Sequence, residues 1–474
     1  MLFEHLARVL AGNPRALQTE DRIIPGQALL DSVDTFTQVL ERHRIRRLGL
    51  LLDNEPAWVT ADLAALAAGI VLVPVPGFFS PAQRRHLIRD AGLDAVLAPQ
   101  AMPDASARLE TELGILNRFE PQQPTPLPPG TAKITYTSGT TGKPKGVCLS
   151  QANLLAVSRA LHEATTLAGI ERHLCLLPLA LLLENLAGLY VPWLSGASVI
   201  LEPMHRLGVR GASGIDAPTM LNALSRLQPQ SLILVPALLP VVMAGRRRQL
   251  PDRYRFLALG GGRTAERLQQ QARALGLPLY EGYGLSEAAS VVAMNRPGDS
   301  RPGTVGRVLP HVEVRIGAGN EVQVRGNSFL GYLGEPPVSN DGWLATGDRG
   351  RLDSDGHLSI EGRCKATIVT AMGRNVAPEW LEAEFCALPG VQQAYVYGDE
   401  VRGIGALVVT DSHDPEQLRS LVNRHLPDYA RVGAIRTTTA PFTTERQELT
   451  ANGRLRRQAL AQRLKETPWD FSTV

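Results

Sequence analysis

Residues 134–147, Ile-Thr-Tyr-Thr-Ser-Gly-Thr-Thr-Gly-Lys-Pro-Lys-Gly-Val, combine three glycines, two lysines and several hydroxyl side chains. Glycine lets the backbone approach a ligand closely, hydroxyl groups donate hydrogen bonds, and lysine supplies positive charge. This combination is suited to wrapping an anion such as phosphate. It is not a Walker loop, because G-x-x-x-x-G-K-[ST] is absent. A flexible surface linker is the alternative, which we disfavour because the pattern places an apolar strand before the loop and an amphipathic helix after it.

Lysine is rare in this chain, and two of its five lysines lie in that loop. The lysines are residues 133, 143, 145, 365 and 465, whereas the other 44 of the 49 basic residues are arginines. Since arginine serves for most surface roles, each remaining lysine is a candidate for a specific function.

Short apolar runs alternate with helical patterns over most of the chain. We predict strands at 48–52, 70–75, 94–98, 133–137, 197–201, 231–235 and 255–259, and helices at 34–44, 57–68, 81–91, 151–167, 185–194, 217–227 and 263–275. Such alternation is typical of parallel sheets covered by helices. The loop then follows a strand and precedes a helix that begins near Ser150, so we expect a strand, a glycine-rich turn and a helix.

The pattern changes after about residue 303, where short strands and frequent turns predict an antiparallel β region. A new α/β pattern begins near residue 366, with strands at 367–370, 391–397 and 404–410 and helices at 378–387 and 414–425. The predicted fold class is α/β: a large N-terminal domain of parallel α/β sheets with an antiparallel β subdomain, and a small mobile α+β C-terminal domain. We place the N-terminal domain at 1–361, a hinge at 362–366 and the C-terminal domain at 367–474.

Composition restricts the classes of function. The net charge of +3 is too weak to indicate a nucleic-acid-binding surface. The four cysteines form no C-x-x-C pair, so they indicate neither a zinc site nor a disulfide framework, and they suit a reducing, cytoplasmic location. Residues 63–83 carry no charge, but their prolines and glycines predict a helix followed by a buried strand rather than a transmembrane segment.

The motifs together resemble those of the ANL superfamily of adenylate-forming enzymes, which contains acyl-CoA synthetases, peptide-synthetase adenylation domains and beetle luciferases. Tyr136–Gly146 is similar to the phosphate loop of that superfamily. Further motifs follow in the family's order over residues 45–457. Gly260–Gly262 resembles the glycine turn beside the adenine, and Tyr280–Glu287 resembles the adenine- and magnesium-binding motif. Trp343–Asp348 resembles the ribose-binding motif. Gly362–Lys365 resembles the hinge, and Gly373–Glu379 resembles the segment that follows the hinge.

The resemblance implies ATP-dependent activation of a carboxylic acid to an acyl adenylate, followed by transfer to the thiol of coenzyme A or to the phosphopantetheine of a free-standing acyl carrier protein. Mg²⁺ and cations must offset the repulsion between the anionic acid and ATP. The implied catalytic residues are Thr141, Lys145, Glu287, Lys365 and Arg454, with Glu287 and Thr141 as the oxygen ligands of Mg²⁺. The implied nucleotide- and cofactor-binding residues are Thr137, Ser138, Gly139, Thr140, Gly142, Lys143, Gly260, Gly261, Gly262, Tyr283, Gly284, Ser286, Asp348, Arg363 and Gly373.

By the same resemblance, Asp348 would accept hydrogen bonds from both ribose hydroxyls with Arg363 nearby, and Tyr283 would stack on the adenine. Lys365 would absorb the rotation at the hinge, and Gly373 would line a tunnel for the pantetheine arm. Plainer interpretations exist for each: turn residues at 348 and 373, a surface ion pair at 363, a core tyrosine at 283, and a helix-start glutamate at 287.

Two positions depart from the family's pattern. The C-terminal motif normally carries a lysine that bridges the carboxylate and the phosphate, and here Arg454 stands in its place. Arginine keeps the charge but has a bulkier fork. Either Arg454 works and reflects the chain's arginine bias, which we favour, or adenylation is slow or lost.

The second departure is Leu181, which replaces the histidine of the family's Leu-Pro-Leu-x-His-x-x-Glu pattern in wholly apolar surroundings. No aspartate is placed to meet an α-amino group, so an amino-acid substrate is disfavoured, and an apolar pocket suits a fatty or aromatic acid. We predict a ligase for an apolar carboxylic acid, with a fatty acid preferred. An aryl-acid:CoA ligase is one alternative, and a non-catalytic protein that binds nucleotide or acyl adenylate is an alternative of another class.

Overall fold

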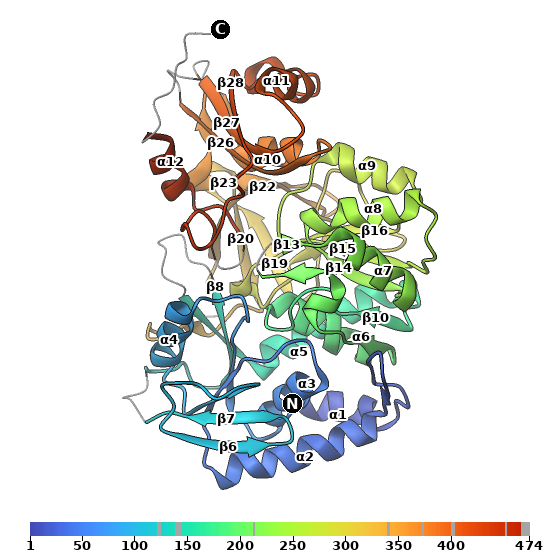
Figure 1. Cartoon of the computed structure of the whole chain (residues 1–474), viewed down its shortest axis with the longest axis vertical. Helices are drawn as coiled ribbons and strands as arrows, with labels where there is room; N and C mark the ends of the chain where they lie inside the picture. Colours follow the sequence, from blue (N-terminus) through green and yellow to red (C-terminus); the bar gives the residue numbers. More distant parts are fainter. Residues whose placement is uncertain are drawn as a thin grey trace.

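The computed structural model of the chain describes residues 1–120, 125–137, 145–211, 214–338, 342–370, 374–399, 403–450 and 453–465. The C-terminal helices α10–α12 and strands β26–β28 form one end of the molecule beside α9, while α1, α2 and the β6–β7 hairpin form the opposite end (Figure 1). Within the described ranges, no helix has both the length and the apolar character needed to cross a bilayer.

One large sheet has eight strands in the order β21-β9-β8-β4-β3-β5-β7-β6. Its centre is parallel, as predicted: β3 (Arg47–Leu50), β4 (Val71–Pro74), β5 (Ala95–Ala98) and β8 (Thr131–Thr137). Its margins are antiparallel: β6 (Ala107–Thr111), β7 (Gly114–Arg118), β9 (Lys145–Ser150) and β21 (Gly331–Tyr332). The helices that precede or connect these strands are α2 (Gly26–Arg42), α3 (Pro56–Ala67) and α4 (Pro81–Asp90).

A second large sheet has nine strands in the order β18-β17-β16-β15-β14-β10-β11-β1-β2. Its parallel part is β1 (Leu17–Gln18), β11 (Ser198–Ile200), β10 (Arg172–Leu174), β14 (Ser231–Leu234), β15 (Phe256–Leu259) and β16 (Leu279–Tyr283). The antiparallel edge strands are β2 (Ile23–Ile24), β17 (Ala293–Met294) and β18 (Arg307–Val308). Helices α7 (Ala217–Leu227), α8 (Leu239–Arg247) and α9 (Glu266–Ala274) lie between its strands in the chain, and α1 (Leu2–Ala11) precedes them. Helix α5 (Gln151–Thr165) contacts β8 and β9 of the first sheet, and β12 (Val209–Arg210) and β13 (Gly214–Ile215) form a small ribbon.

The predicted frame around the glycine-rich loop is wrong. The loop joins β8 to the antiparallel strand β9, and helix α5 begins only afterwards, with the Ser150 side chain accepting a hydrogen bond from the Asn153 N–H as its N-cap. The loop therefore closes a hairpin instead of leading into a helix. Lys145 is the first residue of β9, at the point where the hairpin returns to the sheet.

Other elements differ from the prediction in extent or type. Helix α2 begins at Gly26, well before residue 34, and the helix predicted at 185–194 is a π-helix over Glu184–Tyr190 followed by α6 (Val191–Leu194). Helix α1 and the β6–β7 hairpin were not predicted. Both large sheets are mixed, so the expectation of parallel sheets holds only at their centres.

The predicted antiparallel region is present as the sheet β19-β20-β22-β23. Its strands are Val312–Ile316, Glu321–Gly326, Leu344–Leu352 and Leu358–Arg363. The predicted C-terminal elements are also present: β24 (Ile368–Val369), α10 (Pro378–Cys386), β26 (Val391–Asp399), β27 (Gly403–Thr410) and α11 (Pro415–Asn423). β25 (Asn375–Val376), β28 (Ala434–Thr438) and α12 (Arg457–Lys465) complete this part and were not predicted.

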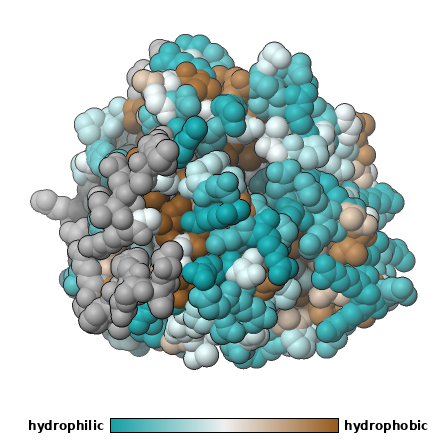
Figure 2. All heavy atoms as spheres, turned by 90° about the horizontal axis from the view of Figure 1, so that it is seen from above, coloured by the Kyte–Doolittle hydropathy of each residue, from teal (hydrophilic) through white to brown (hydrophobic). Residues whose placement is uncertain are grey.

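The cores follow this organisation. Two large clusters of buried apolar residues fill the N-terminal part, and two further clusters lie entirely within residues 368–464. Strand β23 ends at Arg363 within the predicted hinge, and a 3-10 turn over Cys364–Ala366 follows it. The domain boundaries stay a prediction. On the face seen from the C-terminal end, hydrophilic residues predominate, with smaller apolar patches between them (Figure 2).

Candidate active site

Asp348 and Arg363 face each other on neighbouring strands. They are paired in the register of β22 and β23, and Arg363 Nε lies 3.0 Å from Asp348 Oδ1. The hydroxyl of Tyr283 donates a 2.6 Å hydrogen bond to Asp348 Oδ2. Burial, and then the adjacent carboxylate, raise the pKa of Tyr283, so this hydroxyl keeps its proton. Asp348 is thus held in one orientation, and each of its oxygens has a further lone pair for a ligand hydroxyl.

Glu287 lies in a tight turn with unusual backbone geometry. Ala289 and Ser290 have φ values of +54° and +105°, which cost energy for residues other than glycine. Gly284 is required beside them, because a Cβ there would lie 1.5 Å from the Ser290 carbonyl oxygen. Such strain persists only where the surrounding structure holds the backbone in place, and it is frequent at functional sites.

The Glu287 carboxylate has a partner that the sequence did not point to. Tyr332 donates a 2.9 Å hydrogen bond to Glu287 Oε1, and burial together with this carboxylate raises the pKa of the tyrosine. Lys145 Nζ lies 4.5 Å from the centre of the Tyr332 ring and 3.1 Å from Glu335 Oε1. Lys145 therefore lies one side chain away from Glu287, at a half-exposed position.

Arg454 reaches this region from the C-terminal part of the chain. A short hairpin carries it: Leu449 bridges to Leu455, and the Arg454 N–H donates to Thr450 Oγ1 at 3.0 Å. Burial lowers the pKa of the Arg454 guanidinium, as does the charge of Arg363, while Asp348 and Glu287 raise it. The side chain nevertheless keeps an exposed surface. Its guanidinium is therefore near enough to charged groups of the N-terminal part for their charges to affect its pKa.

Gly260, Gly261 and Gly262 form the turn after β15. Gly261 has a φ of +79°, a conformation that favours glycine. A Cβ on Gly260 would lie 3.7 Å from the Gly282 carbonyl oxygen and 3.9 Å from Leu183 Cδ2. The turn thus lies between β16 and the leucine-rich segment 177–183.

The leucine-rich segment lies between the two large cores. Leu177, Leu179 and Leu182 are buried, and the partly buried Leu181 and Leu183 pack against the second cluster. Leu181, at the position of the family's histidine, is thus surrounded by apolar side chains. An apolar wall therefore lies directly beside the glycine turn.

Three further predicted residues are placed without an informative contact. Ser286 begins the 3-10 turn that carries Glu287, and Thr137 Oγ1 lies 3.5 Å from the Lys145 carbonyl oxygen, the limit of a hydrogen bond. Lys365 is exposed on the turn after β23. The remaining predicted site residues lie outside the described residues and stay predictions: Ser138, Gly139, Thr140, Thr141, Gly142, Lys143 and Gly373.

Two arginines near α9, which no motif predicted, contact α10 of the C-terminal part and the end of β23 beside the predicted hinge. Arg267 on α9 donates to Glu384 Oε2 at 2.9 Å and to the Glu384 carbonyl oxygen at 2.8 Å on α10. Arg263 donates to the carbonyl oxygens of Ile360 at 3.2 Å and Glu361 at 2.7 Å, next to the predicted hinge. These arginines belong to no motif, so no sequence signal distinguishes them from ordinary surface residues.

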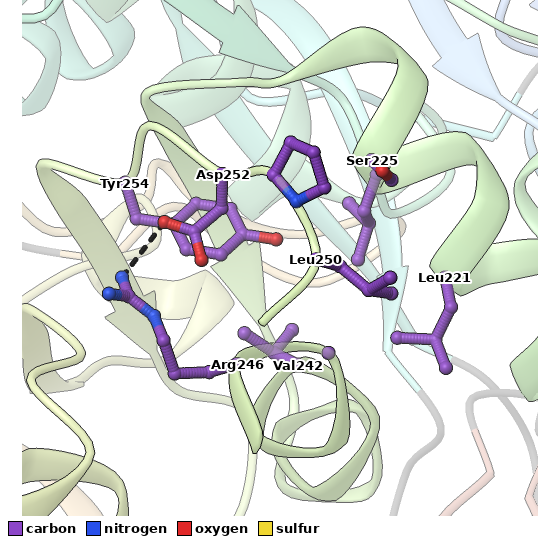
Figure 3. A pocket seen from close by; sticks show the side chains of 10 residues that line it. Leu221, Ser225, Val242, Arg246, Leu250, Asp252 and Tyr254 are labelled. Atoms are coloured by element: carbon purple, nitrogen blue, oxygen red, sulfur yellow. Dashed lines mark hydrogen bonds and ion pairs between the residues drawn. The ribbon is translucent and has the colours of Figure 1, made fainter. Parts of the chain in front are cut away.

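A separate small pocket lies between α7, α8 and the segment 250–254 (Figure 3). Arg246 and Asp252 form a 2.8 Å ion pair beside it. No predicted site residue lines this pocket. We assign it no part in the candidate site.

Two family models match the chain. The AMP-binding enzyme model matches residues 6–333, and the AMP-binding enzyme C-terminal domain model matches residues 381–447. The first match alone spans more than half of the chain.

Known proteins match as well. The long-chain-fatty-acid–CoA ligase FadD15 of Mycobacterium bovis is 31% identical over 75% of this chain and 71% of that protein. The indoleacetate–CoA ligase of Aromatoleum aromaticum is 33% identical over 68% of this chain and 65% of that protein. The crystal structure of the anthranilate CoA ligase AuaEII in complex with anthranoyl-AMP shares the fold, with a TM-score of 0.81 and 21% identity over 98% of this chain and 97% of that chain.

Proposed function

Because this chain belongs to the family of AMP-binding enzymes, we propose that it activates an apolar carboxylic acid, with a fatty acid preferred, and transfers the acyl group to a thiol. The chain is an AMP-forming acid–thiol ligase of the acyl-CoA synthetase type. ATP and coenzyme A are the cosubstrates of this type of enzyme. The proposal adds the class of acid and the residues that act on it.

The observation that carries the proposal is the position of Arg454. It comes from the C-terminal part, yet the charges of Asp348, Glu287 and Arg363 act on it. This proximity supports the proposal that the predicted ribose, magnesium and catalytic residues act on the same bound nucleotide. A leucine-rich wall lies beside the neighbouring glycine turn, where an apolar acyl group could extend.

The proposed reaction has two steps. A carboxylate oxygen of the acid attacks the α-phosphorus of ATP, and the bond to the leaving pyrophosphate breaks. The thiol sulfur then attacks the acyl carbon, the bond from that carbon to AMP breaks, and the thiol proton passes to solvent. Arg454 would stabilise the charge that develops in the first step, while Asp348 would hold the ribose and Arg363 would hold Asp348.

The residues present fit a magnesium ion. Magnesium is usually bound by one or two carboxylates together with the substrate's phosphates. Glu287 Oε1 accepts a hydrogen bond from Tyr332, which orients the carboxylate and leaves lone pairs on both oxygens for a cation. When bound, the ion would neutralise phosphate charge, and the role of Glu287 would be to hold it.

An apolar acid is favoured by the segment 177–183, which presents leucine where the family's pattern has histidine. The proteins named above include one ligase for long-chain fatty acids and two for aromatic acids. An aryl acid therefore stays the second candidate, and the wholly apolar segment 177–183 is our reason for preferring the fatty acid.

ATP–pyrophosphate exchange with a panel of acids tests the proposal. We expect exchange with fatty acids, and weaker or no exchange with benzoate, indoleacetate and amino acids. If only aromatic acids supported exchange, the substrate would be an aryl acid and not a fatty acid. No exchange with any acid, with AMP still bound, would contradict the proposed catalysis.

The acceptor, the motion and the location belong to the same proposal. We expect coenzyme A or a free-standing acyl carrier protein to supply the thiol after the part that begins near residue 367 rotates about residues 362–366. A reducing cytoplasmic location fits the four cysteines, all of which are free. Product analysis with coenzyme A and with phosphopantetheinylated carrier protein would identify the acceptor.

A further inference from the structure

Three side chains with different donor atoms meet in the interior between β10, β14 and the π-helix over Glu184–Tyr190. His173, Cys175 and Glu184 are 3%, 0% and 0% exposed. One ligand atom from each lies within 4.8 Å of those of the other two, and His173 Nε2 is 3.7 Å from Glu184 Oε1. The cluster includes none of the residues placed in the nucleotide site.

The protein leaves these donors incompletely satisfied. Among the described residues, neither oxygen of Glu184 nor His173 Nε2 makes a hydrogen bond of good geometry, although His173, Cys175 and the Leu177 backbone lie near enough to stabilise the Glu184 carboxylate. A buried carboxylate held this weakly is costly, and such groups are normally paired or bind a metal. The Cys175 thiol donates to the Gly188 carbonyl oxygen at 3.4 Å. These weakly paired atoms therefore face one another in the protein interior.

The local structure orients all three side chains inward. His173 and Cys175 lie two residues apart in extended chain, so they share one face of the sheet. His173 is paired in register with Ser231, and its Nδ1 lies 2.7 Å from Ser231 Oγ. This hydrogen bond directs Nε2 toward Glu184, as the second-shell partner of a metal-binding histidine does.

The π-helix provides the remaining donor and the space. It places Glu184 at its start, and π-helical turns are frequent at functional sites. Gly188 follows one turn later, where a Cβ would lie 2.8 Å from Glu184 Oε1 and 3.0 Å from His173 Nε2. Any larger residue at 188 would fill the space that the cluster encloses.

We propose that His173, Cys175 and Glu184 bind one zinc ion. Zinc takes imidazole nitrogen and carboxylate oxygen at about 2.0–2.2 Å and thiolate sulfur at about 2.3 Å. His173 Nε2 and Glu184 Oε1, which lie 3.7 Å apart, can therefore both bind one zinc ion with an obtuse angle between the two bonds. A thiolate, a carboxylate and a neutral imidazole together balance the charge of a divalent cation, so the loaded site is neutral and compatible with burial. The Gly188 carbonyl oxygen, which accepts a hydrogen bond from Cys175, is a candidate for a fourth ligand.

The thiolate selects the metal class. Magnesium and calcium prefer oxygen ligands, whereas a mixed nitrogen, sulfur and oxygen set suits zinc. Binding releases the Cys175 proton to solvent, and the buried position means that the ion enters as the chain folds. The ion would join β10 to the π-helix on either side of residues 177–183, so its role is to fix the leucine-rich segment.

Metal analysis of the full chain tests this directly. Protein purified without chelators should contain about one zinc per chain by inductively coupled plasma mass spectrometry. Protein refolded with Co²⁺ should show a thiolate-to-cobalt charge-transfer band in the near ultraviolet. Cys175→Ala should lose that band, whereas Cys148→Ala, which removes another buried cysteine on β9, should keep it.

The competing account places a proton rather than a metal between His173 and Glu184, because burial raises the pKa of Glu184. Wild-type protein with no zinc, no charge-transfer band on refolding with cobalt and a melting temperature insensitive to chelator would establish that account and overturn the proposal. Zinc retained at the wild-type level in both Cys175→Ala and Glu184→Gln would also overturn it, since the ion would then lie elsewhere. None of these measurements depends on ligase activity.

Discussion

Replacing Arg454 with alanine should slow adenylation and spare thiol transfer. A cation about 4 Å from an anionic oxygen is worth about 4 kcal/mol at an effective dielectric constant of about 20. Losing one donor to a developing oxyanion typically costs about 2.7–4 kcal/mol. Arg454 is exposed, and Arg363 supplies a second positive charge nearby, so we expect the lower limit. That corresponds to a loss of about a hundredfold in the adenylation rate.

Single-turnover measurements of the two half-reactions would test this. Adenylation is followed by acyl-AMP formation, and transfer is followed with a supplied acyl adenylate and the thiol. Arg454→Lys should retain or improve adenylation. Arg419→Ala is the matched control, because it removes an arginine of the same C-terminal part that is paired with Glu416 on its own helix. If Arg454→Ala formed the adenylate at the wild-type rate, another cation would have to take this role.

Four further changes have specific outcomes. Glu287→Ala should raise the Mg²⁺ concentration that adenylation requires, and an unchanged magnesium titration would remove this residue from the metal site. Arg267→Ala breaks both contacts with Glu384 on α10, which help to hold the C-terminal part in the position proposed for adenylation. The variant should therefore form acyl-AMP more slowly but transfer a supplied acyl adenylate at the wild-type rate. Equal losses in both steps would indicate a general structural role for Arg267. Lys133→Arg should lower the free energy of unfolding by about 1–3 kcal/mol through overpacking, as measured by denaturant titration. Burial lowers the pKa of His311 to about 4, so as the pH falls the unfolded state takes up this proton before the folded state does, and the free energy of unfolding falls between about pH 6.5 and 4. His311→Gln should remove up to about 3 kcal/mol of that loss. If the variant and the wild type lost stability equally over this pH range, His311 would not be its cause.

The sequence predicted helices and strands well where the apolar periodicity and the capping or turn residues indicate the same boundaries. Helix α7 was placed at its observed bounds, because Asp216 caps it and an apolar stripe runs along it. The prediction from sequence failed at β9, because the apolar run over Gly146–Leu149 is too short to distinguish a strand from the segment that leads into a helix. The π-helix was also not predictable, since one extra residue per turn leaves no periodic signature in so short a segment.

The candidate site could be proposed from its parts but not from its assembly. Motif resemblance pointed to Asp348, Glu287 and Arg454, whose roles stay predictions, whereas the proximity of Arg454 to the other two depends on how the C-terminal part packs against the rest. Arg267 contributes to that packing, and its contacts with Glu384 join segments far apart in sequence. Tyr332 beside Glu287 was missed for the same reason, because a single tyrosine in an edge strand carries no local signal.

The surroundings of Lys133 explain why that position holds a lysine, and the comparison bears on Arg454. Lys133 is 0% exposed, and its Nζ contacts the side-chain oxygens of Asp62 at 2.6 Å, Tyr190 at 3.1 Å, and Asn185. A compact ammonium group suits this closed set of oxygens, whereas the planar fork of arginine would need more room. Arg454 is instead exposed, so its surroundings leave room for the larger fork. The closed set of oxygens explains why lysine stands at position 133, whereas the open surroundings of Arg454 accommodate an arginine, which favours Arg454 as a working substitute rather than a sign of lost chemistry.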